Sequence, residues 1–340
     1  MGCSVVARYW RQVRAVLHRQ RTLPASQVLP LYREPGVLWG YRMYDKSLFY
    51  YIISIFQINN ETVNIWTHLV AILLFLKKIW KLADEFHFYS DPESWPLLGF
   101  GICCLAYAIL SVSAHTIHSK SPFIHYTCFQ ADYAGIGYYG IGIGIIVFYS
   151  SSHPGWFQFL SRVYMPLNVF LGWVVMLGCS MAKLRYKRPY PFRRKLLQLC
   201  SGGMHAILIV LPLQARYTEC YRKTDCSLSS LNHHTEVFLV LFSSLFFFSS
   251  HFPEKIWPGK FDLVGQGHQI FHVLATITTL KQFDAAYIDI TKHRHTLITD
   301  KADMFEIVLS IILFAFISII TILVLRPIVK QRVLQDLKDM

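Results

Sequence analysis

Apolar residues recur along the chain in long stretches that are separated by short polar and basic segments. Each stretch holds about 17–25 residues, the length of α-helix that crosses roughly 30 Å of hydrocarbon. The pattern predicts an all-α protein, a multi-pass transmembrane helical bundle, because helices satisfy their own backbone groups in lipid. The eight predicted spans are 63–82, 96–117, 129–149, 163–182, 195–214, 235–252, 266–289 and 305–325.

Composition favours a membrane protein over a soluble one. Hydrophobic residues make up 54% of the chain and charged residues 16%, with a mean hydropathy of +0.36, whereas a soluble domain carries about 25% charged residues. Residues 1–60 are basic and mixed, which does not fit a cleavable signal peptide. We therefore expect a basic N-terminal segment over 1–60, a transmembrane domain over 61–325 and a tail over 326–340. Within 1–33, apolar residues at helical spacing alternate with arginines, which predicts a basic amphipathic helix on the membrane surface.

The basic residues predict the orientation in the membrane. Residues 1–60 hold eight Lys and Arg, the loop 183–195 holds seven and the tail from Arg326 holds four. With eight spans, these three segments fall on one side, and the positive-inside rule makes that side, with both termini, cytoplasmic. The net charge of +13 then indicates contact with an anionic membrane surface, and no nucleic-acid partner is expected.

Three histidines and one aspartate lie at span ends that this topology places on the cytoplasmic side. His115 ends the second span, Asp132 opens the third, and His268 and His272 begin the seventh. Spacing of i, i+4 puts the last two on one face of a helix. Ionisable side chains are costly at membrane depth and usually pair or bind something, and three neutral imidazoles suit Zn²⁺. The sequence therefore predicts a buried zinc site near the cytoplasmic side, with His115, His268 and His272 as ligands.

Asp132 and Ser111 are candidate catalytic residues if such a site performs hydrolysis. Asp132 could be a fourth ligand, or it could accept a hydrogen bond from a zinc-bound water and act as a general base, since zinc lowers the pKa of bound water to about 7. Ser111 lies one turn before His115 and could bond to a ligand, to the water or to a substrate oxygen. A hydroxyl in a span more often bonds to a carbonyl of its own helix.

A second polar cluster opens the first span. Glu61, Asn64 and His68 are spaced to share one helix face, which we expect to point into the bundle near the zinc site. They either orient the metal ligands or form an interhelical hydrogen-bond set, and the second interpretation is favoured because polar groups often join spans in this way.

Two of the eight cysteines differ from the others in their environment. Cys220 and Cys226 lie in the loop between the fifth and sixth spans, which the topology places outside the cell. An extracellular disulfide is plausible in that oxidising compartment, and two free thiols remain the alternative.

Seven segments of the chain form a recognisable set of motifs: "NETVNIWTH", "SVSAH" at Ser111–His115, "ADYAG", "GHQIFH", "LYREPGVLWGYR", "YKRPYP" and "HFPEKIWPGKFD". Together they resemble a known family, the progestin and adipoQ receptors, and within it the membrane progestin receptor branch with its alpha- and beta-type members. The resemblance covers nearly the whole chain from about Leu31. It implies a seven-helix core followed by an extra C-terminal span, zinc bound by His115, His268 and His272, and a metal-bound water held by Asp132.

The resemblance implies a function that composition and spacing alone do not reveal. It predicts a plasma-membrane receptor for progestin-type steroids that acts through heterotrimeric G proteins to lower cAMP, with a steroid or lipid as ligand. The alternative is a zinc-dependent amide hydrolase that acts on a membrane lipid such as ceramide, an activity ascribed to the wider family, and steroid binding could regulate it. The receptor is favoured over the enzyme. A proton or ion pathway is the weakest option, because only Lys281 and Asp284 add charge to the seventh span.

Overall fold

The computed structural model describes residues 22–187, 190–224, 226–292 and 302–338. Most of the predicted amphipathic helix, up to residue 21, lies outside this part of the chain. In the described residues, the secondary structure is helical except for one isolated β-bridge between Leu23 and Tyr41. This agrees with the predicted all-α class.

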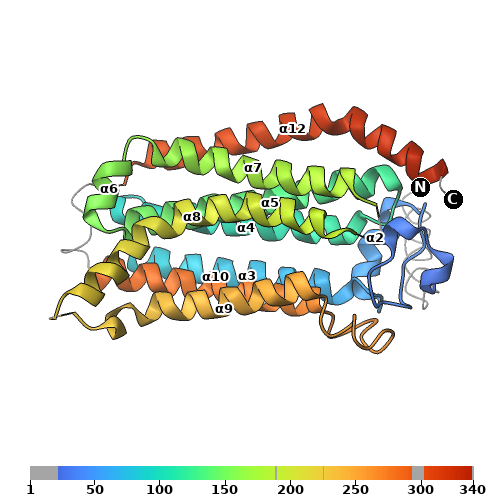
Figure 1. Ribbon diagram of the computed structural model, residues 1–340, viewed down its shortest axis with the longest axis horizontal. Coiled ribbons are helices and arrows are strands. Elements are labelled where there is room, and N and C mark those ends of the chain that lie inside the picture. The colour runs from blue at the N-terminus through green and yellow to red at the C-terminus, as the bar shows by residue number, and fades with distance from the viewer. Residues whose placement is uncertain (1–21, 188–189, 225, 293–301, 339–340) are drawn as a thin grey trace, which may run out of the picture.

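Eight long α-helices and two short ones, together with five short 3-10 helices, form the described part of the molecule (Figure 1). The short helices are α2 (Leu48–Ile53), near the N-terminal segment, and α6 (Pro154–Leu160), at the opposite end. The long helices are α3 (Thr62–Glu85), α4 (Trp95–Ile117), α5 (Pro122–Ser151), α7 (Tyr164–Arg185), α8 (Phe192–Arg222), α9 (Asn232–Ser250), α10 (Gly267–Lys292) and α12 (Met304–Lys338). Large apolar side chains stay exposed on their outer faces, as contact with lipid requires; examples are Leu73, Ile207, Phe242 and Ile312.

Seven of the long helices in the described residues are long and apolar enough to cross a membrane, and α10 is not among them. The expectation of eight apolar spans is therefore met by seven. The physical reason is that α10 carries polar groups along much of its length, including His268, His272 and Asp289. It packs against α3, α4, α5 and α9, and these neighbours supply hydrogen-bond partners that lipid would not.

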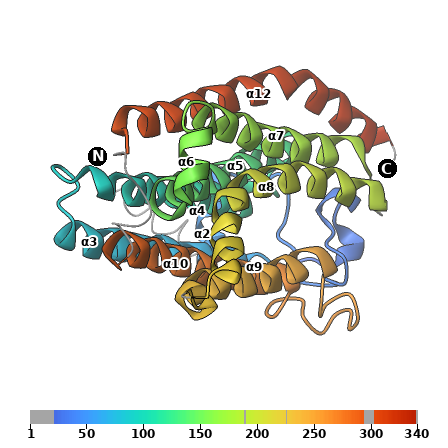
Figure 2. The same cartoon turned by 60° about the vertical axis from the view of Figure 1, so that its left-hand side comes forward.

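Helix α5 lies at the centre of the bundle, in contact with α4, α7, α8, α10 and α12. Its glycines allow this close packing. A methyl group on Gly137 would lie 2.3 Å from Cζ of Phe314 in α12 and 2.9 Å from the carbonyl oxygen of Gly172 in α7. In lipid, no hydrophobic driving force brings helices together. Small residues instead let the helices associate through close van der Waals contact. Helix α12 packs on the outside of this arrangement, against α5 and α7 (Figure 2).

The N-terminal segment from Thr22 and the end of α12 lie at the same end of the bundle (Figure 1). The segment folds back onto the helices and onto the connection between α9 and α10. Gly36 has a φ of +80°, and a Cβ there would lie 2.2 Å from the carbonyl oxygen of Glu254. Only glycine allows both this backbone conformation and this close approach. At the other terminus, α12 continues through Arg326 to Lys338, so most of the predicted tail is helical.

Candidate metal centre

The structure brings His115, His268 and His272 together at the end of the bundle that carries the N-terminal segment. His115 lies in the last turn of α4, and the other two lie in the first turns of α10. Nε2 of His268 is 3.3 Å from Nε2 of His115 and 3.1 Å from Nε2 of His272. One nitrogen from each ring lies within 4.8 Å of the other two. The convergence expected from the topology and from the i, i+4 spacing is therefore present.

Hydrogen bonds at Nδ1 orient the rings of His115 and His272. Nδ1 of His115 lies 2.8 Å from Oε2 of Glu61. Nδ1 of His272 lies 3.3 Å from the carbonyl oxygen of Asn64 and 3.1 Å from Oγ1 of Thr67. A carboxylate and a carbonyl only accept hydrogen bonds, so each Nδ1 carries the proton and each Nε2 presents a lone pair. The lone pairs of His115 and His272 both face His268.

This arrangement fits a zinc ion. Two lone pairs that converge beside a third ring nitrogen form a favourable place for a cation. A tetrahedral ion with Zn–N distances of about 2.0–2.1 Å separates its ligand nitrogens by roughly 3.3 Å, close to the 3.3 and 3.1 Å that separate Nε2 of His268 from Nε2 of His115 and of His272. The hydrogen bonds to Glu61 and Asn64 are of the kind that orient metal-binding histidines in other proteins. His115, His268 and His272 are thus the residues that would hold the metal.

The polar cluster at the start of α3 contacts this site directly. Asn64 donates from Nδ2 to Oε2 of Glu61 at 2.9 Å, the same oxygen that His115 contacts. The ring of His68 stacks on that of His272 with centroids 3.9 Å apart, and its Nε2 lies 3.2 Å from the hydroxyl of Tyr107. Since these contacts join α3 to α4 and α10, the cluster links helices and at the same time positions the two histidines.

Glu61 is held as a carboxylate. Burial alone would raise the pKa of its carboxyl group, but its contacts with His115 and His118 outweigh that effect and keep the pKa well below its usual range. Nε2 of His118 lies 3.4 Å from Oε1 of Glu61. The negative charge beside His115 strengthens that ring as a ligand for a cation.

Replacing Glu61 by glutamine is expected to lower zinc affinity by roughly 10–100-fold, because an amide is a weaker acceptor for His115 than a carboxylate. The measurement is competition between the purified protein and a chelator of known affinity. Glu236→Gln is the matched control, since Glu236 forms an exposed pair with Lys281. Equal affinity in the Glu61 variant and the wild type would show that this carboxylate does not orient His115.

Asp132 is not part of the group of three nitrogens. It lies on α5 beside Ser111, within electrostatic reach of His115 and of Lys183. Ser111 is buried on α4, one turn before His115. The structure thus places Asp132 and Ser111 together and near the histidines.

Arg42 is a residue of this region that sequence reasoning missed. It is only 5% exposed, and it donates hydrogen bonds to the carbonyl oxygens of His115 at 2.6 Å and Thr116 at 2.7 Å. These carbonyls belong to the last turn of α4, where the helix itself supplies no donors. Arg42 therefore fixes the end of α4 that carries His115. One arginine in a basic segment is usually solvated, so the residue type alone did not indicate a buried role. The only indication in the sequence was that Arg42 lies in the motif "LYREPGVLWGYR".

Comparison with known proteins identifies the family. The profile of the family described as haemolysin-III related matches residues 56–283, the stretch that holds Glu61, Asp132 and the three histidines. The chain belongs to this family, the progestin and adipoQ receptors. With seven helices able to span a membrane within its described residues and membrane receptors among its relatives, it is a multi-pass membrane protein.

Several relatives of this chain are named membrane progestin receptors. It is 35% identical to membrane progestin receptor beta of Mus musculus over 92% of this chain and 89% of the relative. It is 39% identical to the Homo sapiens beta receptor over 79% of this chain and 76% of the relative. It is 34% identical to membrane progestin receptor alpha-B of Danio rerio over 80% and 77%. The resemblance drawn from the motifs is confirmed.

A second buried cluster lies near the other end of α10 and was not predicted. Asp289 accepts hydrogen bonds from both terminal nitrogens of Arg216, at 2.7 and 3.0 Å, and lies 3.1 Å from His233 and 2.8 Å from His234. The two histidines and the aspartate are close enough to hold a cation, but the guanidinium of Arg216 already neutralises the carboxylate and would repel one. We therefore assign this cluster, about 30 Å from His268 along α10, to the joining of α8, α9 and α10.

Two smaller features stand at the same end. A disulfide joins Cys220 to Cys226 just after Arg216. Lys281 and Asp284, considered above for an ion pathway, instead form ion pairs with Glu236 and Lys78. Both pairs are at least partly exposed, so neither provides a buried polar path across the bundle.

Proposed function

We propose that this protein is a plasma-membrane receptor for progestin-type steroids. The observation that carries the proposal is the similarity to membrane progestin receptors alpha and beta over most of their length. The helical bundle supports it, because an apolar ligand can reach a site in such a bundle from the lipid. Zinc at the three histidines would hold the end of α4 against the start of α10, and the folded receptor would depend on this contact. We extend the proposal to coupling with heterotrimeric G proteins that lowers cAMP.

Saturable binding of radiolabelled progesterone to the purified chain in lipid nanodiscs is the direct test. We expect the wild type to bind and unlabelled progestin to compete, and we expect cells that express it to lower cAMP when progestin is added. A chain that folds and yet shows no saturable binding would overturn the receptor proposal.

A zinc-dependent lipid amide hydrolase is the second candidate, and the observation that favours it is the position of Asp132 beside Ser111 near the three histidines. Zinc would supply a Lewis acid. Asp132 would take up a proton from the attacking water, and Ser111 would donate a hydrogen bond to the carbonyl oxygen of the amide. Both residues are held by helices rather than loops, which favours a fixed geometry.

Asp132→Asn separates the two candidates. We expect the variant to retain zinc and progestin binding, because Asp132 is not among the three ligand residues. If the protein hydrolyses ceramide, the variant should lose about 10²–10⁴-fold in rate, since it lacks a proton acceptor. Fatty-acid release from ceramide by wild type and variant is the measurement. Steroid binding without lipid turnover in the wild type would exclude the hydrolase.

A further inference from the structure

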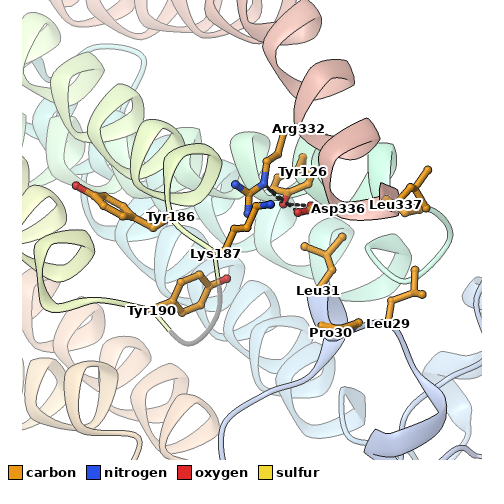
Figure 3. Close-up of a pocket in the computed structure, with 11 residues that line it drawn as sticks. Leu29, Pro30, Leu31, Tyr126, Tyr186, Lys187, Tyr190, Arg332, Asp336 and Leu337 are labelled. Atoms are coloured by element: carbon orange, nitrogen blue, oxygen red, sulfur yellow. Dashed lines mark hydrogen bonds and ion pairs between the residues drawn. The ribbon is translucent and has the colours of Figure 1, made fainter. Parts of the chain in front are cut away.

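A cavity of about 250 Å³ lies at the end of the bundle that carries the N-terminal segment, and the proposed function does not use it (Figure 3). Four parts of the chain meet around it: residues 29–31 of the N-terminal segment, the start of α5, the loop between α7 and α8, and the last turns of α12. Its polar side chains include Lys187, Tyr126, Arg332 and Asp336. Its apolar wall comes from leucines and prolines of the N-terminal segment and α12.

Arg332 is the most informative residue in the cavity. Its side chain is only 8% exposed. Its Nε lies 3.1 Å from the hydroxyl of Tyr126 and 3.2 Å from Oδ1 of Asp336. Among the described residues, its two terminal nitrogens have no hydrogen-bond partner. Because Arg332 lines the cavity, an acceptor that enters this space can pair with those two nitrogens.

The surrounding groups favour an anion. Lys187 reaches the same cavity from the α7–α8 loop (Figure 3), so two cations from different segments face one space. The carboxylate of Asp336 opposes them, but it already accepts a hydrogen bond from Tyr126 at 2.6 Å and contacts Arg332. Its contact with Arg332 is made at Nε, so the two terminal nitrogens are left for a second acceptor. A phosphate group matches this fork, because guanidinium binds phosphate through two parallel hydrogen bonds.

The position of the cavity indicates the source of the phosphate. It lies beside the loop 183–195, which holds seven basic residues, at the end of the bundle that the charge pattern predicts to be cytoplasmic. Basic pockets between helices on that side bind anionic lipid headgroups. The volume falls just below the range of about 300–1,000 Å³ for drug-sized ligands, and Leu31 and Leu337 offer apolar contact to a glycerol backbone. We propose that Arg332 and Lys187 bind the phosphate of an anionic lipid headgroup here.

Binding of dioctanoyl phosphatidic acid to the purified full chain in detergent, measured by calorimetry, tests this proposal. We expect the wild type to bind it and to bind dioctanoyl phosphatidylcholine at least roughly tenfold more weakly, because choline carries a positive charge. Lys187→Gln, at an exposed position where folding should not suffer, is expected to weaken binding of phosphatidic acid by roughly tenfold or more. Arg332→Lys keeps the charge but loses the fork, and it should also weaken binding.

The matched control is Lys330→Gln, which removes the same charge from an exposed position on α12 that does not line the cavity. It should bind phosphatidic acid like the wild type. Equal losses in Lys187→Gln and Lys330→Gln would overturn the proposal in favour of a diffuse surface charge. Inorganic phosphate is added as a competitor: weak competition supports a lipid headgroup, and affinity equal to that of the lipid would overturn that assignment. Unchanged binding in both Lys187→Gln and Arg332→Lys would also overturn the proposal.

Discussion

Replacing His272 by alanine is expected to abolish zinc binding and to produce the largest loss of thermal stability among single changes at the metal centre. The variant removes one of three ligand nitrogens and also the ring that stacks on His68 and bonds to Asn64. At a free zinc concentration a thousandfold above the Kd, binding stabilises the folded protein by about 4 kcal/mol. That contribution would be lost, and the melting temperature of the purified protein would no longer rise when zinc is added.

The control for this variant is a buried histidine in the same bundle that lies outside the metal centre. Nε2 of His205 lies 2.7 Å from Oδ1 of Asn168, and His205 is 3% exposed. His205→Ala should lower the melting temperature through its lost hydrogen bond, but it should retain zinc and the response to added zinc. If the two variants lose stability equally and neither changes its zinc content, the three histidines have only a structural role.

Arg216→Ala is expected to destabilise the protein by about 3–5 kcal/mol, the cost of leaving a buried charge without its partner. Asp289 is fully buried, and two of its hydrogen bonds come from Arg216. The remaining histidines would have to become charged to replace the guanidinium. Thermal unfolding of the purified variant, with zinc saturating, measures the effect without a contribution from the metal centre.

Lys223→Ala provides the comparison, because Lys223 forms an exposed pair with Glu219 close to Arg216 in sequence. Exposed pairs contribute about 0–1 kcal/mol, so this variant should melt near the wild type. The double variant Arg216→Met, Asp289→Leu should recover part of the stability lost in Arg216→Ala, since an apolar pair of similar size avoids the buried charge. A small loss in Arg216→Ala alone would show that the cluster does not join the helices as described.

Hydropathy predicted most of the fold because lipid demands long apolar helices, and seven such helices are present in the described residues. It was less informative for α10 and α12. Helix α10 is polar because its partners are other helices, so the hydropathy of its residues underestimates how deeply it is buried. Beyond Arg326, α12 continues to Lys338, and Tyr126 pairs there with Asp336 and Arg332, a contact between residues more than 200 positions apart that no local pattern reveals.

The grouping of the three histidines was predictable to the extent that the order of the helices and helical spacing determine it. His115 lies at a span end, and His268 and His272 lie one turn apart, so placing these helix ends at the same end of the bundle was enough to bring them together. Arg42 could not be assigned in this way, since its role depends on how the N-terminal segment folds back onto α4. Asp289 and Arg216 were missed for a similar reason: one charge near the end of a span does not reveal its partner on another helix.

The central claim is that His115, His268 and His272 together hold a zinc ion, and metal analysis of the purified wild-type protein tests it most directly. Inductively coupled plasma mass spectrometry of protein prepared without added metal or strong chelator should find about one zinc per chain, lost in His272→Ala and kept in His205→Ala. Well-folded wild-type protein that contains no zinc, and takes up none when zinc is supplied, would contradict the account.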